Sequence, residues 1–119
     1  MIIATTTRWV EEVAIVDVRG RIVLGEQSAA LRDLVADLVS KGHRKIVLNL
    51  GDVNYIDSSG LGNLVSALVR TRMYEGELKL LNLTNKVHQV LRITKLDSVF
   101  DITDNEAVAV GSFGQSAAG

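Results

Sequence analysis

The stretch that determines the fold covers residues 53–62 and reads VNYIDSSGLG. It places a carboxylate, two hydroxyls and two glycines at the start of a pattern with the helical period, whose apolar positions are Leu61, Leu64, Val65, Leu68 and Val69. Ser58 and Ser59 therefore lie on or beside the first turn of a helix that runs to about Tyr74. Free backbone N–H groups and the positive end of the helix dipole favour an anion there. The sequence thus predicts a place that can hold a phosphate.

N-capping is a second interpretation of these polar side chains. Asp57 and the serines belong to the preferred N-cap types, because a side-chain oxygen accepts a hydrogen bond from an N–H two or three residues on, which contributes about 1 kcal/mol. Capping does not explain Gly60 and Gly62, since a glycine inside a helix costs up to ~1 kcal/mol relative to alanine. We therefore expect these glycines to answer a steric demand from outside the domain, such as a docking partner.

Composition limits the class of protein. The chain has 119 residues, 47% of them hydrophobic, which suffices for one domain that buries about two thirds of its unfolded surface. The 13 basic and 14 acidic residues nearly cancel, so we expect no nucleic-acid binding and no direct membrane contact. The chain has no cysteine, no signal-peptide pattern and no apolar run near the ~20 residues that span a bilayer. We expect a cytoplasmic protein.

Strand and helix patterns alternate along the chain. The patterns predict strands over residues 2–7, 13–18, 45–50, 78–83 and 99–102, with Gly20 closing the second and Gly51 leading from the third into the motif. A helix begins at Glu26 and has Gly42 at its C′ position. Thr84 or Asn85 caps a helix after the fourth strand, and Asp104 caps a short last helix through Val110.

Long helices between strands imply crossovers to parallel neighbours. We therefore predict an α/β fold in one domain over residues 1–110, with a mixed, mostly parallel sheet of four to five strands and about four helices packed mainly on one face. Residues 111–119 hold glycines and serines without a periodic apolar pattern, so we expect a disordered tail there.

Several kinds of chemistry are not supported by the motif. A dinucleotide fingerprint needs a third small residue where Val65 stands, a glycine directly at the strand end, and an acid where Asn82 ends the next strand. The chain has no Walker-type Gly-Lys-Ser/Thr and no Gly-x-Ser-x-Gly elbow around Ser58. His43 and His88 have no second ligand at metal spacing. We expect no cofactor, no metal and no catalytic residue.

The residues of the motif, with Val53, Tyr55, Ile56 and the Asp57-Ser58-Ser59-Gly60-Leu61-Gly62 run, resemble the signature of the STAS domain in bacterial anti-sigma factor antagonists. The strand before it, Ile46 to Leu50, and the strand after its helix, Leu78 to Leu83, resemble those of the family as well. The likeness covers roughly residues 10–105.

This resemblance implies a phosphorylation switch at Ser58, the serine directly after the aspartate. The unphosphorylated protein would bind an anti-sigma factor serine/threonine kinase and free a sigma factor for transcription. The phosphorylated protein would be released, and a PP2C-type phosphatase would restore it. The implied contact surface comprises Asp57, Ser58, Ser59, Gly60, Leu61, Gly62, Asn63 and Arg21, on a monomer or weak dimer that is not an enzyme.

The chain departs from the family pattern at two places. Arg21 and Val23 stand where many antagonists have acidic residues, so a basic residue replaces an acidic pair near the kinase-facing side. Glu75 and Lys95 stand where glycines are common, which concerns turn geometry. Two other functions stay open: a STAS scaffold or accessory subunit of a stress-signalling or transporter assembly without a switch, and a small nucleotide-binding enzyme that uses the helix start as its phosphate cradle.

Overall fold

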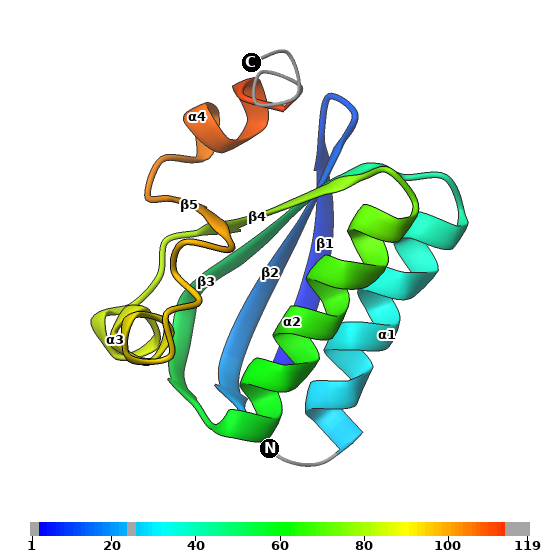
Figure 1. Ribbon diagram of the computed structural model, residues 1–119. Coiled ribbons are helices and arrows are strands. Elements are labelled where there is room, and N and C mark those ends of the chain that lie inside the picture. The colour runs from blue at the N-terminus through cyan, green and yellow to red at the C-terminus, as the bar shows by residue number, and fades with distance from the viewer. Residues whose placement is uncertain (1–2, 24–25, 114–119) are drawn as a thin grey trace.

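The computed structural model of the protein describes residues 3–23 and 26–113 (Figure 1). Its strands are β1 (Ile3–Val10), β2 (Val13–Ile22), β3 (Lys45–Ile56), β4 (Glu77–Leu81) and β5 (Asp101–Thr103), and its helices are α1 (Glu26–Ser40), α2 (Ser58–Met73), α3 (Asn85–Ile93) and α4 (Glu106–Gly111). The strands form one sheet in the order β1-β2-β3-β4-β5.

The sheet is mixed and mostly parallel, as predicted. β1 and β2 form an antiparallel hairpin in which Val10 is opposite Val13, so its turn consists of Glu11 and Glu12. Glu11 has φ 57°, the left-handed conformation that such tight hairpin turns require. β2, β3, β4 and β5 then run parallel to one another, with α1, α2 and α3 in the crossovers between them.

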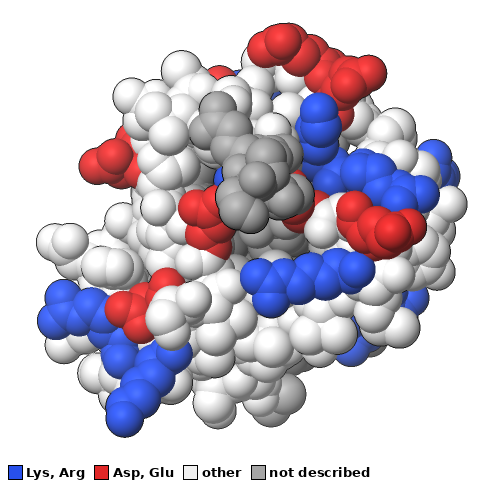
Figure 2. Space-filling view, turned by 45° about the horizontal axis from the view of Figure 1, so that its top comes forward, with Lys and Arg blue, Asp and Glu red and all other residues white. Residues whose placement is uncertain are grey.

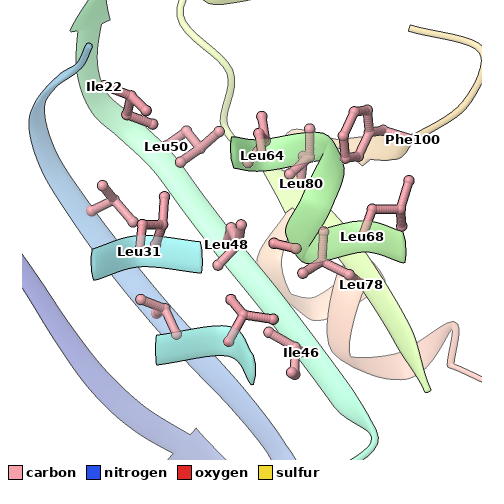
Figure 3. Packing of buried hydrophobic residues seen from close by; sticks show 14 of the residues in the cluster. Ile22, Leu31, Ile46, Leu48, Leu50, Leu64, Leu68, Leu78, Leu80 and Phe100 are labelled. Carbon is pink, nitrogen blue, oxygen red and sulfur yellow. The ribbon is translucent and has the colours of Figure 1, made fainter. Parts of the chain in front are cut away.

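The main core lies between the sheet and helices α1, α2 and α3. α1 and α2 lie side by side against the sheet in Figure 1. Figure 3 shows Ile22, Leu48 and Leu80 of the strands meeting Leu31 of α1 and Leu64 and Leu68 of α2. Val87 and Leu91 of α3 belong to the same buried cluster. The apolar period of each helix therefore determines the face that it buries.

Helix α4 packs on the opposite face of the sheet. Val13, Ile15, Val47 and Leu81 alternate along their strands with residues of the main core, and together with Ala109 of α4 they form a second, smaller buried cluster. Lys79 is only 2% exposed on this face, and its ammonium group contacts Asp101 and lies 4.9 Å from the centroid of the Phe113 ring. Three helices on one face and one on the other agree with the prediction of helices mainly on one face.

Two strands are longer than predicted. Gly20 does not close β2, and Gly51 is not a connection, because β2 continues to Ile22 and β3 continues to Ile56. The β2–β3 register shifts between Asp17 and Arg19 and again between Gly20 and Arg21. These irregularities accommodate residues such as Gly20, with φ 109°, inside the ladder. The motif therefore follows directly on a strand, but its first glycine, Gly60, lies inside α2 and not at the strand end, so the arguments against a dinucleotide fingerprint remain.

Smaller boundary predictions also needed correction. β4 ends at Leu81 rather than at 83, because Asn82 adopts a left-handed φ of 61°. β5 covers Asp101–Thr103 rather than 99–102. The cap of α4 is Asn105, whose Oδ1 accepts from the backbone N of Val108 at 3.0 Å, and not Asp104. Both side chains are good N-caps, so the sequence alone does not choose between them.

Other helix ends agree with the sequence. Thr84 caps α3, and Gly42 follows α1 with φ 95°. Of the predicted tail, residues 114–119 lie outside the described residues, whereas Phe113 packs against the smaller buried cluster. Within residues 3–23 and 26–113, no helix is long and apolar enough to cross a membrane.

Candidate functional site

The candidate site is the junction between β3 and α2, at the end of the molecule where β2 and β3 finish (Figure 1). Asp57 is the N-cap of α2, with φ −103° and ψ −179°. Its Oδ1 accepts a hydrogen bond from the Gly60 N–H at 2.7 Å, and its carbonyl accepts from Leu61 at 2.8 Å. Its own N–H donates to the carbonyl of Ile22 at 3.2 Å. One aspartate thus ties the helix start to the end of β2, and the capping interpretation of Asp57 is confirmed.

Packing within the domain requires a glycine at position 60, whereas the sequence led us to expect a requirement from a docking partner. A Cβ at this position would lie 2.1 Å from the carbonyl oxygen of Ile22 and 2.8 Å from its Cγ2. No side chain fits this close approach between α2 and β2. Gly62 differs, because a Cβ there would have nothing within 4 Å. Packing within the domain therefore explains the glycine at position 60 but not the glycine at position 62.

The predicted contact residues divide into a buried and an exposed set. Gly60 and Leu61 are buried and face the interior of the domain. Ser58, Ser59 and Gly62 are exposed, and Asp57 and Asn63 are half-buried. Both hydroxyls therefore stand at the solvent side of the first helical turn, where backbone N–H groups lack intrahelical acceptors.

Arg21 belongs to the same end of the sheet. It is exposed and lies opposite Tyr55 in the β2–β3 register, and Tyr55 is 42% exposed. The next pair, Ile22 and Ile56, is buried in the main core, so Arg21 and Tyr55 point to the other face of the sheet. The structure thus places a cation near the end of β2 and an aromatic ring near the end of β3, the two strand ends that Asp57 joins.

Arg32 of α1 is a neighbour of the site that the sequence did not indicate. Its Nη1 donates to Oδ1 of Asn63 at 3.4 Å, and its Nε donates to Asp33 at 3.2 Å. The contact joins α1 to the second turn of α2. An i to i+31 contact leaves no trace in the local pattern, so only the packing of the two helices reveals it.

A cluster of charged side chains lies elsewhere, on the face covered by α4. Arg8 donates to Asp17 (Nε to Oδ2, 2.7 Å) and to Glu106 of α4 (Nη1 to Oε2, 3.1 Å), and Asn49 donates to Asp17 at 2.8 Å. Hydrogen bonds from Arg8 hold the pKa of both Asp17 and Glu106 below their ordinary values. The same bonds, first that of Glu106, raise the pKa of Arg8. The cluster fastens α4 to the sheet.

The charge distribution shows no field of one sign on the face in Figure 2, where acidic and basic side chains are interspersed. This arrangement fits the near-zero net charge of the chain. Among the described residues, no group of three or more His, Cys, Asp or Glu side chains is arranged to hold a metal ion. The helix start therefore offers two exposed hydroxyls, with a half-buried carboxylate and a half-buried side-chain amide beside them.

Comparison with known proteins gives the family. A family model described as the STAS domain matches residues 4–109. BtrV of Bordetella bronchiseptica, named as an anti-sigma factor antagonist, is 35% identical over 89 residues, which span 72% of this chain and 77% of BtrV. The crystal structure of TM1081 from Thermotoga maritima, likewise named, matches with a TM-score of 0.76 at 30% identity, over 89% of this chain and 91% of TM1081.

SpoIIAA of Bacillus has the same fold. Its unphosphorylated form matches with a TM-score of 0.73 at 19% identity, over 88% of this chain and 92% of SpoIIAA. Its phosphorylated form matches with a TM-score of 0.68 at 18% identity, over 88% of this chain and 96% of SpoIIAA. Because the STAS model spans most of the sequence and the relatives match over more than two thirds of their own lengths, the chain belongs to the STAS-domain family of anti-sigma factor antagonists.

Proposed function

We propose that this protein is an anti-sigma factor antagonist whose partner binding is switched by phosphorylation of Ser58. Unphosphorylated, it binds an anti-sigma factor serine/threonine kinase and thereby frees a sigma factor. Phosphorylated, it is released, and a PP2C-type phosphatase restores the free hydroxyl. The surface that binds the kinase consists of the exposed residues of the helix start, Ser58, Ser59 and Gly62, with the half-buried Asp57 and Asn63, and it extends over the end of the sheet to Arg21.

The observation that carries this proposal is an exposed hydroxyl on a rigidly held helix start. Ser58 follows Asp57 directly, and Asp57 is fixed by its bonds to Gly60, Leu61 and Ile22. A kinase can reach such a hydroxyl without unfolding the domain. SpoIIAA, which shares the fold, is named in a phosphorylated and an unphosphorylated form.

The physical effect of a phosphate at Ser58 differs inside and outside the domain. Inside, the N-terminus of α2 tolerates the anion because its free N–H groups and dipole favour negative charge. At an interface built around a neutral hydroxyl, the added charge of about −1.5 to −2 must be desolvated, and its repulsion by the adjacent Asp57 carboxylate grows when water is excluded. A thousandfold loss of affinity requires only ~4 kcal/mol. Phosphorylation can therefore break binding while leaving the fold intact.

Site mapping tests the modification itself. The kinase is first recovered from lysate of the native cell by its binding to the unphosphorylated protein, and the purified pair is incubated with ATP. Mass spectrometry of wild type, Ser58→Ala and Ser59→Ala then locates the phosphate. We expect one phosphate on wild type and on Ser59→Ala, and none on Ser58→Ala.

Two outcomes would contradict the switch. One is a phosphate that Ser58→Ala still acquires at the same rate. The other is recovery of transporter or stress-assembly subunits equally by wild type and Ser58→Asp, which would favour a constitutive scaffold. ATP turnover by the protein alone would favour the nucleotide-binding enzyme instead.

A further inference from the structure

Within residues 3–23 and 26–113, no strand pairs with the outer edge of β1. β1 is the first strand in the sheet order, and among the described residues it pairs only with β2. Thr5, Thr6 and Trp9 are exposed on it, Trp9 by 49%. We propose that this edge binds the β1 edge of a second copy of the chain, so that two antiparallel β1 strands join two sheets into one about a twofold axis at Thr6.

The edge lacks the devices that usually prevent such pairing. Protected edge strands are short, bulged, or carry lysine or proline. β1 has 8 residues, contains neither lysine nor proline, and keeps an unshifted register with β2 over its whole length. Its one charged residue, Arg8, is already bound to Asp17 and Glu106. A charge engaged inside its own molecule deters an incoming strand poorly.

The hairpin register determines which backbone groups face outward. In an antiparallel pair, residues alternate between those that exchange hydrogen bonds with the partner strand and those that do not. A two-residue turn closes on a bonded pair, here Val10 and Val13. Counting back from Val10, the N–H and C=O groups of Trp9, Thr7, Thr5 and Ile3 point away from β2. These are the groups that a second strand can bind.

This alternation restricts self-pairing to a few registers. Outward-facing residues must meet outward-facing residues, so the axis passes through a residue and not between two. Centring on Thr6 pairs Thr5 with Thr7 and Ile3 with Trp9, which uses every outward-facing residue of β1. Centring on Thr7 would leave Ile3 without a partner strand.

The Thr6-centred register is also compatible in its side chains. It brings Arg8 opposite Ala4 of the second copy and Thr6 opposite Thr6, so no like charges meet. Directly opposed threonines form favourable cross-strand pairs. One strand edge is smaller than the ~1,200 Å² or more that stable interfaces bury, so the dimer forms weakly and depends on concentration.

Cysteine trapping tests the register, since the native chain contains no cysteine. In the proposed dimer, the two Thr6 positions form a non-hydrogen-bonded pair with Cα atoms ~4.5 Å apart, within the range of a disulfide. Two cysteines at position 7 would be diagonal neighbours about 7–8 Å apart, too far to bridge. We expect Thr6→Cys to oxidise to a disulfide dimer and Thr7→Cys to stay largely monomeric under identical conditions, read by non-reducing electrophoresis. Equal trapping, no trapping, or preferential trapping at position 7 would overturn the proposal.

Sedimentation velocity tests the association without a cross-link. Thr5→Pro removes an outward-facing N–H and leaves the bonds to β2 in place, whereas Thr5→Ser keeps that N–H. We expect wild type and Thr5→Ser to sediment faster as concentration rises and Thr5→Pro to remain monomeric, with circular dichroism confirming that all three are folded. A wild type that stays monomeric at every concentration, or a folded Thr5→Pro that associates like wild type, would overturn the proposal.

Discussion

At the scale of single residues, the two glycines of α2 differ in the space around them: Gly60 lies against β2, and Gly62 faces open space. We expect Gly60→Ala to lower the free energy of unfolding by about 1–3 kcal/mol, because the new Cβ collides with the backbone of Ile22 and α2 must move from β2. Gly62→Ala is the matched control on the same helix. It should raise stability by about 0.5–1 kcal/mol, since its Cβ enters open space. Urea unfolding of wild type and the two variants measures these changes. Equal changes in the free energy of unfolding for both variants would contradict the close approach of Gly60 to Ile22.

Lys95 carries a cost that a glycine would remove. It follows the last turn of α3 with φ 62°, a conformation that L-residues adopt reluctantly, and Leu96 N–H then donates to the carbonyl of Leu91 at 2.8 Å. We expect Lys95→Gly to stabilise the protein by up to about 1 kcal/mol in urea unfolding. Lys95→Ala, which keeps the Cβ, is the control and should leave stability nearly unchanged. A destabilised Lys95→Gly would show that the lysine side chain contributes more than its backbone costs.

The sequence predicted the identity of the important residues better than their reasons. The D-S-S-G-L-G run identified the helix start, and Glu75 and Lys95 were singled out as departures from glycine; both have positive φ. The demand on Gly60 was placed outside the domain because the sequence does not show that Ile22 lies against it. Close contacts between distant elements arise from packing and leave no local pattern.

At the scale of elements, the Arg8 cluster controls how firmly α4 is held. The lowered pKa values of Asp17 and Glu106 mean that their ionised forms stabilise the fold above their ordinary values of 3.8 and 4.5. That contribution is lost as the pH falls through the lowered values. We expect Arg8→Gln to be less stable than wild type at neutral pH, and the difference to shrink as the pH falls below about 4.

Urea unfolding of wild type and Arg8→Gln across this pH range measures the difference. Lys41→Gln is a suitable control, because Lys41 pairs with Asp37 at 3.0 Å on the exposed surface of α1. Exposed pairs of this kind contribute little. A gap between wild type and Arg8→Gln that stays constant from neutral to acid pH would contradict the role of the two carboxylates.

Helices were predicted more accurately than strands, for a physical reason. A helical stripe of apolar residues extends over many positions, so α1, α2 and α3 were found with their buried faces, and Thr84 was one of the two caps predicted for α3. β2 and β3 were cut short because Gly20 and Gly51 are typical of turns, whereas here the β2–β3 ladder absorbs its irregularities as register shifts. The packing of α4 against the sheet was not predicted, since Arg8 and Glu106, which form the contact, are 98 residues apart in the chain.

At the scale of the whole molecule, the two faces of the sheet have separate roles. α1, α2 and α3 build the main core and present Ser58 at one end, while α4 covers the smaller cluster at the other end of the molecule in Figure 1. The outer edge of β1 is a third surface. In the proposed function, phosphorylation at Ser58 would therefore change a surface that is built apart from the α4 contact, so binding could switch without a change of fold.

The affinity for the anti-sigma kinase, measured by calorimetry for wild type, Ser58→Asp and Ser59→Asp, tests the central claim most directly. Both substitutions place a carboxylate in the first turn of α2, so they share any effect on the helix. We predict a loss of binding of at least about a hundredfold, or ~2.7 kcal/mol, for Ser58→Asp and a clearly smaller loss for Ser59→Asp. Binding of Ser58→Asp as tight as wild type, with the protein folded, would contradict the phosphorylation switch.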